Sequence, residues 1–128
     1  MNKLLLIILL ALISTSAMAE WTQVAGGDNG NLYVDRSTVR KNGNKAKIWG
    51  LIDYSSERHY GDKSYLSSKS LVEYDCTEET GRVLYSTYHS EAQGFGNLIF
   101  TIDIPTQWRP VPPDSGIQIE FAIACGKK

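Results

Sequence analysis

The sequence lacks the motifs by which most enzymes are recognised. Its only histidines, His59 and His89, stand far apart, and neither has a ligand-type neighbour at helical spacing. No serine lies in a Gly-x-Ser-x-Gly context, and the glycines around Phe95 do not form a phosphate-binding pattern. Four clustered carboxylates fit a solvated strand face that runs into a turn better than a calcium site: Glu73, Asp75, Glu78 and Glu79. We therefore expect no catalytic residue, no cofactor and no metal.

A surplus of charge of one sign is also missing. The 13 lysines and arginines stand against 14 aspartates and glutamates, which leaves a net charge of −1. This near balance gives no electrostatic reason to expect a nucleic acid or an acidic membrane as a partner. Cysteine is scarce as well, because the chain has only Cys76 and Cys125, and these do not form a Cys-x-x-Cys redox motif.

The one long apolar run lies at the start of the chain, from Leu4 to Ile13. Lys3 precedes it and a small-x-small sequence ending at Ala19 follows, which is the pattern of a secretory signal peptide over residues 1–19. We expect cleavage after Ala19, since the alternative, an uncleaved anchor, needs roughly 20 apolar residues to cross the bilayer. No cysteine lies near the cleavage site, so we expect no lipid anchor. The exported product would stay in the periplasm, with the cell surface and secretion as alternatives.

The expected mature chain, residues 20–128, is long enough for a single domain. A domain of this size buries roughly 65% of the surface that its unfolded chain exposes, so its core is marginal. An even pair of cysteines behind an export signal favours a structural disulfide, because the compartments outside the cytoplasm are oxidising. A bond between Cys76 and Cys125 would close a long loop and stabilise the fold by about 4 kcal/mol.

Alternating apolar and polar residues predict about six β-strands. The expected strands cover residues 20–25, 31–35, 45–54, 71–76, 82–89 and 97–104. Between them, the polar stretch 35–40 fits one helical turn, and the stretch 55–68, rich in serine and charge, fits an exposed loop. Alternation within residues 71–76 places Val72, Tyr74 and Cys76 on one face of their strand.

The last stretch of the chain, residues 115–125, carries two conflicting signals. Its isoleucines alternate with polar or small residues, which favours a strand. Its ends favour a helix: Ser115 and Gln118 fit a capping box, and Gly126 fits a C-terminal cap. The residues alone leave both structures open.

Seven tyrosines and three tryptophans suggest a recognition surface. Several apolar residues lie on strand faces that one helix cannot cover together, and an uncovered apolar face usually meets a partner. We single out five residues as a candidate partner surface: Trp49, Leu51, Tyr60, Tyr65 and Tyr85. The alternative is that these aromatic residues reflect only the strand preference for such side chains.

Several blocks in order along the chain resemble the bacterial surface-adhesin protein E-like family. They are Trp21, Tyr33-Val-Asp35 with Ser37-Thr-Val-Arg-Lys-Asn-Gly43, Ser67-Ser-Lys-Ser-Leu-Val-Glu-Tyr-Asp-Cys76, and Trp108-x-Pro-Val-Pro-Pro-x-Ser115 ending at Cys125. The resemblance implies an α+β fold, in which a six-stranded antiparallel sheet carries one C-terminal helix on one face. It also implies a strand-to-helix disulfide and a homodimer. Residues 20–128 would then form a single domain of this family.

The expected function is that of a small, exported, non-catalytic interaction domain. The resemblance implies protein partners, with host extracellular-matrix or plasma proteins as the class to test. Two alternatives belong to other classes: a periplasmic structural subunit of an envelope complex, and a secreted hydrolase whose site matches no known motif.

Overall fold

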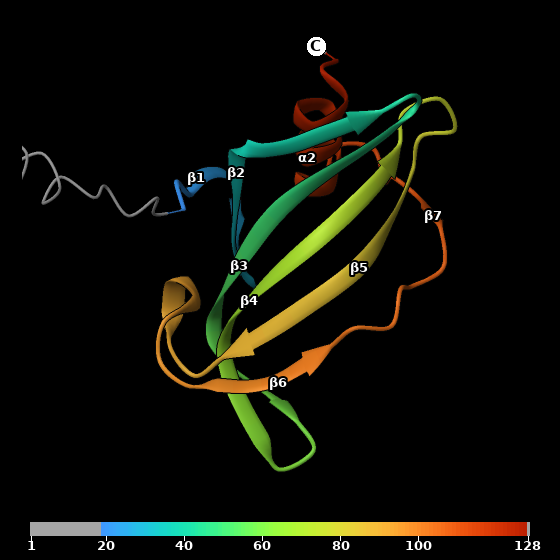
Figure 1. Cartoon of the computed structure of the whole chain (residues 1–128). Coiled ribbons are helices and arrows are strands. Elements are labelled where there is room, and N and C mark those ends of the chain that lie inside the picture. Colours follow the sequence, from blue (N-terminus) through green and yellow to red (C-terminus); the bar gives the residue numbers. More distant parts are fainter. Residues whose placement is uncertain (1–18, 128) are drawn as a thin grey trace, which may run out of the picture.

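Six β-strands follow one another across one antiparallel sheet, in the order in which they occur in the chain (Figure 1). The computed structural model describes residues 19–127, so the predicted signal peptide, apart from Ala19, lies outside the described residues. The six strands are β1 (Thr22–Gly27), β2 (Gly30–Asn42), β3 (Lys45–Tyr60), β4 (Lys63–Asp75), β5 (Thr80–His89) and β6 (Leu98–Ile102).

Three short elements complete the fold. The 3-10 turn η1 (Ala92–Gly94) precedes β6, and the two-residue strand β7 (Arg109–Pro110) pairs with β5. The helix α2 (Gly116–Cys125) follows and packs against β1, β2, β3 and β4 near one end of the sheet. The predicted architecture, an antiparallel sheet with one C-terminal helix on one face, is confirmed.

The helix α2 begins and ends where the sequence places its caps. Ser115 Oγ accepts a hydrogen bond from Gln118 N at 3.2 Å, and Gln118 Oε1 accepts one from Asp114 N at 2.8 Å. At the other end Gly126 adopts the left-handed conformation, with a φ of 67°, and stops the helix. These end signals decide the structure of the segment, and the alternation of its isoleucines does not produce a strand.

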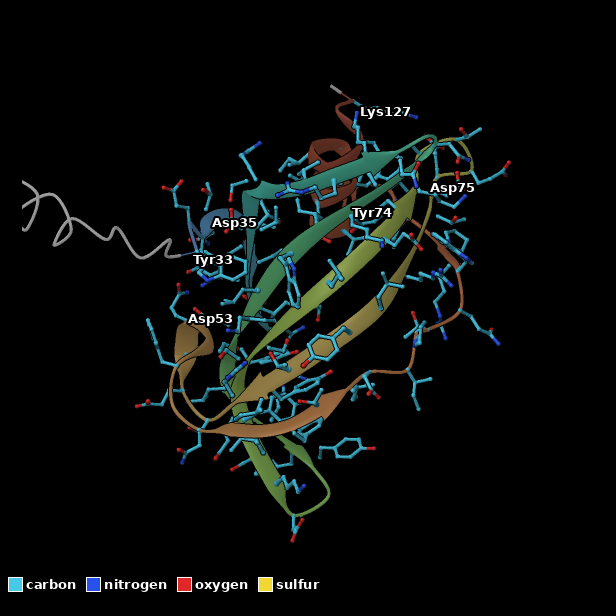
Figure 2. The ribbon with its side chains drawn as sticks, in the orientation of Figure 1. Tyr33, Asp35, Asp53, Tyr74, Asp75 and Lys127 are labelled. Carbon is cyan, nitrogen blue, oxygen red and sulfur yellow. A yellow bond between two sulfur atoms is a disulfide. The ribbon has the colours of Figure 1, made fainter. Side chains whose placement is uncertain are left out.

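The core lies between α2 and the half of the sheet beneath it. Its buried members are Val34, Ala46, Ile48, Tyr74, Phe121, Ala124 and Cys125. Tyr74 is 1% exposed, and its ring meets Phe121 edge-on with 5.6 Å between centroids, at the end of the sheet where the helix lies (Figure 2). Val72 packs against the same core, so the predicted inward face of this strand is confirmed.

The two acidic residues of β4, Glu73 and Asp75, form ion pairs, and Asp75 also accepts hydrogen bonds from the turn that follows the strand. Arg82 Nη2 lies 2.8 Å from Glu73 Oε1, and Lys45 Nζ lies 3.2 Å from Asp75 Oδ2. Asp75 also accepts hydrogen bonds from the backbone N–H groups of Thr77 and Glu78, and the bond from Glu78 is the main reason that its pKa is lowered. The two carboxylates have structural partners on the strand and in the turn that follows it.

The predicted disulfide joins Cys76, directly after β4, to Cys125, the last residue of α2. The Cα atoms of the two cysteines are 5.7 Å apart. Two lysines fasten the same end of the helix: Lys41 Nζ donates to Cys125 O at 2.7 Å, and Lys127 Nζ donates to Cys76 O at 2.6 Å. Positive charge at the C-terminal end of a helix also offsets the negative end of its dipole.

The loop predicted at residues 55–68 is wrong. This stretch forms the ends of β3 and β4, which extend as a hairpin around the turn at Gly61 and Asp62 (Figure 1). The two strands resume their pairing at Arg58 and Tyr65 after a register shift. Cross-strand hydrogen bonds satisfy the backbone N–H and C=O groups of the hairpin. A polar segment can therefore form strands even where both faces of the hairpin are exposed to solvent.

The helical turn predicted at residues 35–40 is also wrong, because this stretch lies within β2. Asp35 does accept hydrogen bonds from Ser37 N at 3.0 Å and Ser37 Oγ at 2.5 Å, as a capping residue would. In the structure these hydrogen bonds belong to a β-bulge and not to a helix. Asp35 pairs with Trp49 and Arg40 pairs with Lys47, so β2 has more residues than β3 between these two pairs, and β2 bends sharply there (Figure 1).

Candidate functional site

The five residues predicted to form one partner surface lie in two different places. Trp49 and Leu51 alternate with Ile48 and Gly50, which face α2, so they lie on the opposite face of the sheet. Trp49 meets Tyr85 edge-on there, with 6.1 Å between ring centroids. The other two predicted residues, Tyr60 and Tyr65, belong to the hairpin described below.

The prediction that Leu51 is part of an exposed surface is wrong, because its side chain is 0% exposed. Leu51 lies between Tyr33 and Lys69 in the sheet register, and η1 packs against β3 and β4 on this part of the sheet. Gln93 N, within η1, donates to Asp53 Oδ1 at 2.6 Å and fixes the turn in place; Asp53 marks this region in Figure 2. No local pattern in the sequence indicates that so short a segment covers the strand.

A group of five aromatic rings gathers where the β3–β4 hairpin leaves the sheet. We call this group the aromatic cluster: Tyr54, Tyr60, Tyr65, Tyr88 and Phe100. Phe100 stacks on Tyr88 with 4.2 Å between centroids and on Tyr60 with 4.8 Å. Tyr65 meets Tyr54, Tyr88 and Phe100 edge-on, at 5.5, 4.8 and 5.6 Å.

The aromatic cluster is partly open to solvent. Tyr60 is 61% exposed, whereas the other four rings are half-buried. Burial raises the pKa of Tyr88 and of Tyr65, so both hydroxyl groups stay protonated at neutral pH. The cluster thus presents an uncharged aromatic surface with Tyr60 at its outer edge.

A groove of about 820 Å³ lies on the helix side of the sheet. The N-terminal end of α2, the strands β1 to β5 and the connector at residues 106–112 enclose it, and we call it the sheet–helix groove. Its apolar walls come from Ala25, Leu32, Ile52, Val72, Val83, Pro110, Val111, Pro112 and Ile117. Tyr54 lines the groove as well, so the groove adjoins the aromatic cluster.

Small side chains leave the floor of this groove hollow. Gly50 of β3 pairs with Ser70 of β4, and Ser70 pairs with Ser86 of β5, so three neighbouring strands carry a small residue in one row. The two serine Oγ atoms lie 2.7 Å apart and hydrogen-bond to each other. The small side chains of this row therefore leave room in the groove, and the two serine hydroxyl groups satisfy each other's hydrogen bonding.

One carboxyl group, that of Glu120 on α2, reaches the floor of the groove. Glu120 is 4% exposed, and its Oε1 accepts a hydrogen bond from Tyr74 Oη at 2.5 Å. Its Oε2 faces Gly50, where a Cβ atom would come within 2.5 Å, so a larger residue at position 50 would displace this carboxyl.

Burial raises the pKa of Glu120 to about 7, although the hydrogen bond from Tyr74 opposes the rise. Burial also raises the pKa of the Tyr74 hydroxyl, and the neighbouring Glu120 adds to this effect. The pair is therefore a tyrosine donor and a carboxyl group that holds its own proton in mildly acidic solution. Sequence reasoning did not single out either residue as part of a site.

Three arginines, Arg58, Arg82 and Arg109, supply the positive charge of the groove. Arg82 is engaged in the ion pair with Glu73 and lies over the ring of Trp108, 4.6 Å from its centroid. Arg58 and Arg109 are exposed, and Arg58 lies 5.2 Å from the centroid of the Tyr54 ring.

Other classes of site find no support in the described residues. Within residues 19–127, no group of three or more histidines, cysteines and carboxylates is arranged to hold a metal ion. His89 is buried and its Nε2 lies 2.8 Å from Thr87 Oγ1, and burial lowers its pKa. None of the helices in the same range is long and apolar enough to cross a membrane.

Comparisons with known proteins agree on one fold. Residues 21–126 match the family model described as surface-adhesin protein E, and no curated protein matches in sequence. A structure of Haemophilus influenzae protein E is similar at 12% identity, with a TM-score of 0.64 and coverage of 88% of each chain. Its second crystal form gives a TM-score of 0.66 at 12% identity, covering 88% of this chain and 91% of that one.

A further structure, of protein E from non-typeable Haemophilus influenzae, gives a TM-score of 0.57 at 13% identity. It covers 88% of this chain and 79% of that one. At such low identity these likenesses concern the fold, whereas the family model spans almost all of the described residues. The chain therefore belongs to the surface-adhesin protein E family.

Proposed function

We propose that this chain is a non-catalytic, adhesin-like interaction domain that binds a protein partner through the aromatic cluster. The observation that carries the proposal is the stacked, partly exposed group of five rings, with Tyr60 61% exposed. Membership of the surface-adhesin protein E family supports a binding role. Host extracellular-matrix and plasma proteins are the partner class that we propose to test first.

The geometry of the cluster favours binding for a physical reason. Rings that already stack on one another lose little conformational freedom when a partner covers them, so more of the contact energy remains for affinity. Tyrosine is also enriched among the residues that dominate protein interfaces. Tyr60 lies in the hairpin, which extends away from the covered part of the sheet (Figure 1). A large partner can therefore reach Tyr60.

The variant Tyr60→Ser tests the proposal. Tyr60 is mostly exposed, so its loss should leave the fold intact, and we expect binding to immobilised matrix or plasma proteins to weaken about tenfold, or ~1.4 kcal/mol. Phe95→Ser is the matched control, because Phe95 is 64% exposed and lies outside the cluster. Equal losses for the two variants, or no binding by the wild-type protein to any member of a broad panel, would contradict the proposal.

Self-association is a second part of the proposal. Among the described residues β6 pairs only with β5, and its region exposes Leu98, Ile102 and Ile104, at 59%, 36% and 75%. An apolar strand edge of this kind invites pairing with another strand. We expect a homodimer by light scattering, and Ile102→Lys should convert it to a monomer; a wild-type protein that is monomeric at all accessible concentrations would exclude it.

Export is the third part, and it rests on the apolar run and small-x-small pattern before Glu20. We expect a tagged chain to appear outside the cytoplasm, in the periplasm or at the cell surface. Fractionation combined with protease treatment of intact cells separates these two places. Recovery of the full-length chain in the cytoplasm would rule out export.

A further inference from the structure

The sheet–helix groove is a cavity that the proposed protein-binding role does not use. We propose that it binds a free long-chain carboxylate, with the hydrocarbon chain along the apolar walls and the carboxylate at the rim beside Arg109.

The size and lining of the groove fit a hydrocarbon chain. Its volume of about 820 Å³ lies within the roughly 300–1,000 Å³ of pockets that take small ligands. Leu32, Ile52, Val72, Val83 and Ile117 provide branched apolar side chains on its walls. Each methylene group removed from water in such a site should strengthen binding roughly fourfold.

The polar groups of the floor bind one another and leave little for a peptide backbone to bind. The Oγ atoms of Ser70 and Ser86 pair with each other, and Tyr74 Oη donates to Glu120 Oε1. The Tyr54 hydroxyl lies 3.1 Å from Ser68 Oγ. A peptide in this groove would bury its own amide groups without partners, whereas a hydrocarbon chain has none to satisfy.

Charge at the rim selects the head group. Arg109 is exposed, and within residues 19–127 it forms no ion pair with a carboxylate. Among the described residues, Glu120 is the only acidic side chain that lines the groove, and its buried carboxyl keeps its proton in mildly acidic solution. Guanidinium groups bind carboxylates through two parallel hydrogen bonds, so an anionic head group fits this rim and a cationic one does not.

Calorimetry with the purified protein tests the proposal. The probes are decanoate and dodecanoate, kept below their micelle-forming concentrations, with dodecanol and dodecyltrimethylammonium as matched ligands of other charge. We expect one dodecanoate per chain, bound at least tenfold more tightly than dodecanol and about 15-fold more tightly than decanoate, which is two methylene groups shorter. No saturable binding is expected for dodecyltrimethylammonium.

Variants then separate the head-group and chain contacts. Arg109→Gln should weaken dodecanoate binding at least threefold and leave dodecanol binding unchanged, because in the proposed arrangement Arg109 contacts only the carboxylate. Arg36→Gln is the matched control, since Arg36 is an exposed arginine of β2 outside the groove. Ile117→Asp changes a side chain that is 48% exposed at the mouth of the groove, so it should abolish binding without unfolding the core.

The location of the bound chain is checked by amide chemical shifts in the full protein. Shifts at Val72 and Ile117 with none at Tyr60 support the groove. Shifts centred on the aromatic cluster, equal affinity for dodecanoate and dodecanol, or an equal effect of Arg36→Gln would overturn the proposal. Binding to phosphatidylglycerol vesicles without binding of free dodecanoate would also overturn it, since it would indicate a membrane surface instead.

Discussion

Glu120 couples the stability of the core to pH. Its ordinary pKa of 4.5 applies to the unfolded chain, whereas burial raises the value in the folded protein to about 7. Between these two values the folded protein holds a proton that the unfolded chain has lost. The free energy of unfolding should therefore be highest below about pH 4.5 with respect to this group and should fall as the pH rises toward 7.

The variant Glu120→Gln provides the measurement. We expect the wild-type protein to lose on the order of 3 kcal/mol of unfolding free energy between pH 4.5 and pH 7 through this residue. The amide that replaces the carboxyl has no proton to lose, and its oxygen can still accept the hydrogen bond from Tyr74. Denaturant unfolding at several pH values should show a smaller dependence on pH in the variant; identical dependences would contradict the assignment.

A few single residues explain what sequence reasoning missed at the site. Gly50 stands alone inside a strand, a pattern that often marks close approach of another group, and here the approaching group is the Glu120 carboxyl. Glu120 itself lies among isoleucines and Phe121, which indicates burial if the segment is a helix. Both signals depend on knowing which helix meets which strand, and the sequence alone does not give that pairing.

Among the elements, α2 depends most on its covalent connection. The helix has ten residues, which is too short to be stable alone, so the disulfide to Cys76 and the contacts of Phe121 and Ala124 hold it on the sheet. We expect Cys125→Ser to lower the free energy of unfolding by about 4 kcal/mol, because it opens a loop with a sequence separation of 49 residues.

Chemical denaturation of oxidised and reduced wild-type protein checks this prediction without any substitution. The reduced protein should match Cys125→Ser in stability and should retain the fold of the sheet. If the reduced protein were as stable as the oxidised one, the disulfide would not contribute to the free energy of unfolding, and the prediction would be wrong.

The elements also show how far the sequence could predict the fold. The caps at Ser115 and Gly126 mark the ends of α2, but the residues alone left helix and strand both open, and only the family resemblance implied the helix. Alternation was sufficient for the inward face of β4. Residues 35–40 and 55–68 were assigned wrongly because their polar composition favours turns and loops. Their backbones form strands through pairing with distant segments, and such pairing leaves little trace in local composition.

At the scale of the whole molecule, the start of the folded domain contacts its middle. Glu20 N donates to Asp35 Oδ2 at 3.2 Å, and Asp35 is 4% exposed. Cleavage after Ala19, as the sequence predicts, would turn this amide into a charged amino group facing a buried carboxylate. We expect a chain that begins at Glu20 to be about 1–3 kcal/mol more stable than the same chain with an acetylated N-terminus.

Thermal and denaturant unfolding of the two forms tests this expectation. In an Asp35→Asn background the difference between them should disappear, since the amino group then lacks its charged partner. If acetylation leaves the stability of the wild-type sequence unchanged, the contact contributes nothing beyond an ordinary hydrogen bond.

The disulfide also determines how the molecule would carry a mechanical load. A pull on the two ends of the folded chain passes from Cys125 directly to Cys76 through the sulfur bridge, whose ends are 49 positions apart in sequence. The segment between them, which includes β5, β6 and the connector, forms a covalently closed ring outside the loaded path. Tyr88 and Phe100 of the aromatic cluster lie within that ring, so a domain under tension would keep these two stacked rings unstretched until β4 itself gives way.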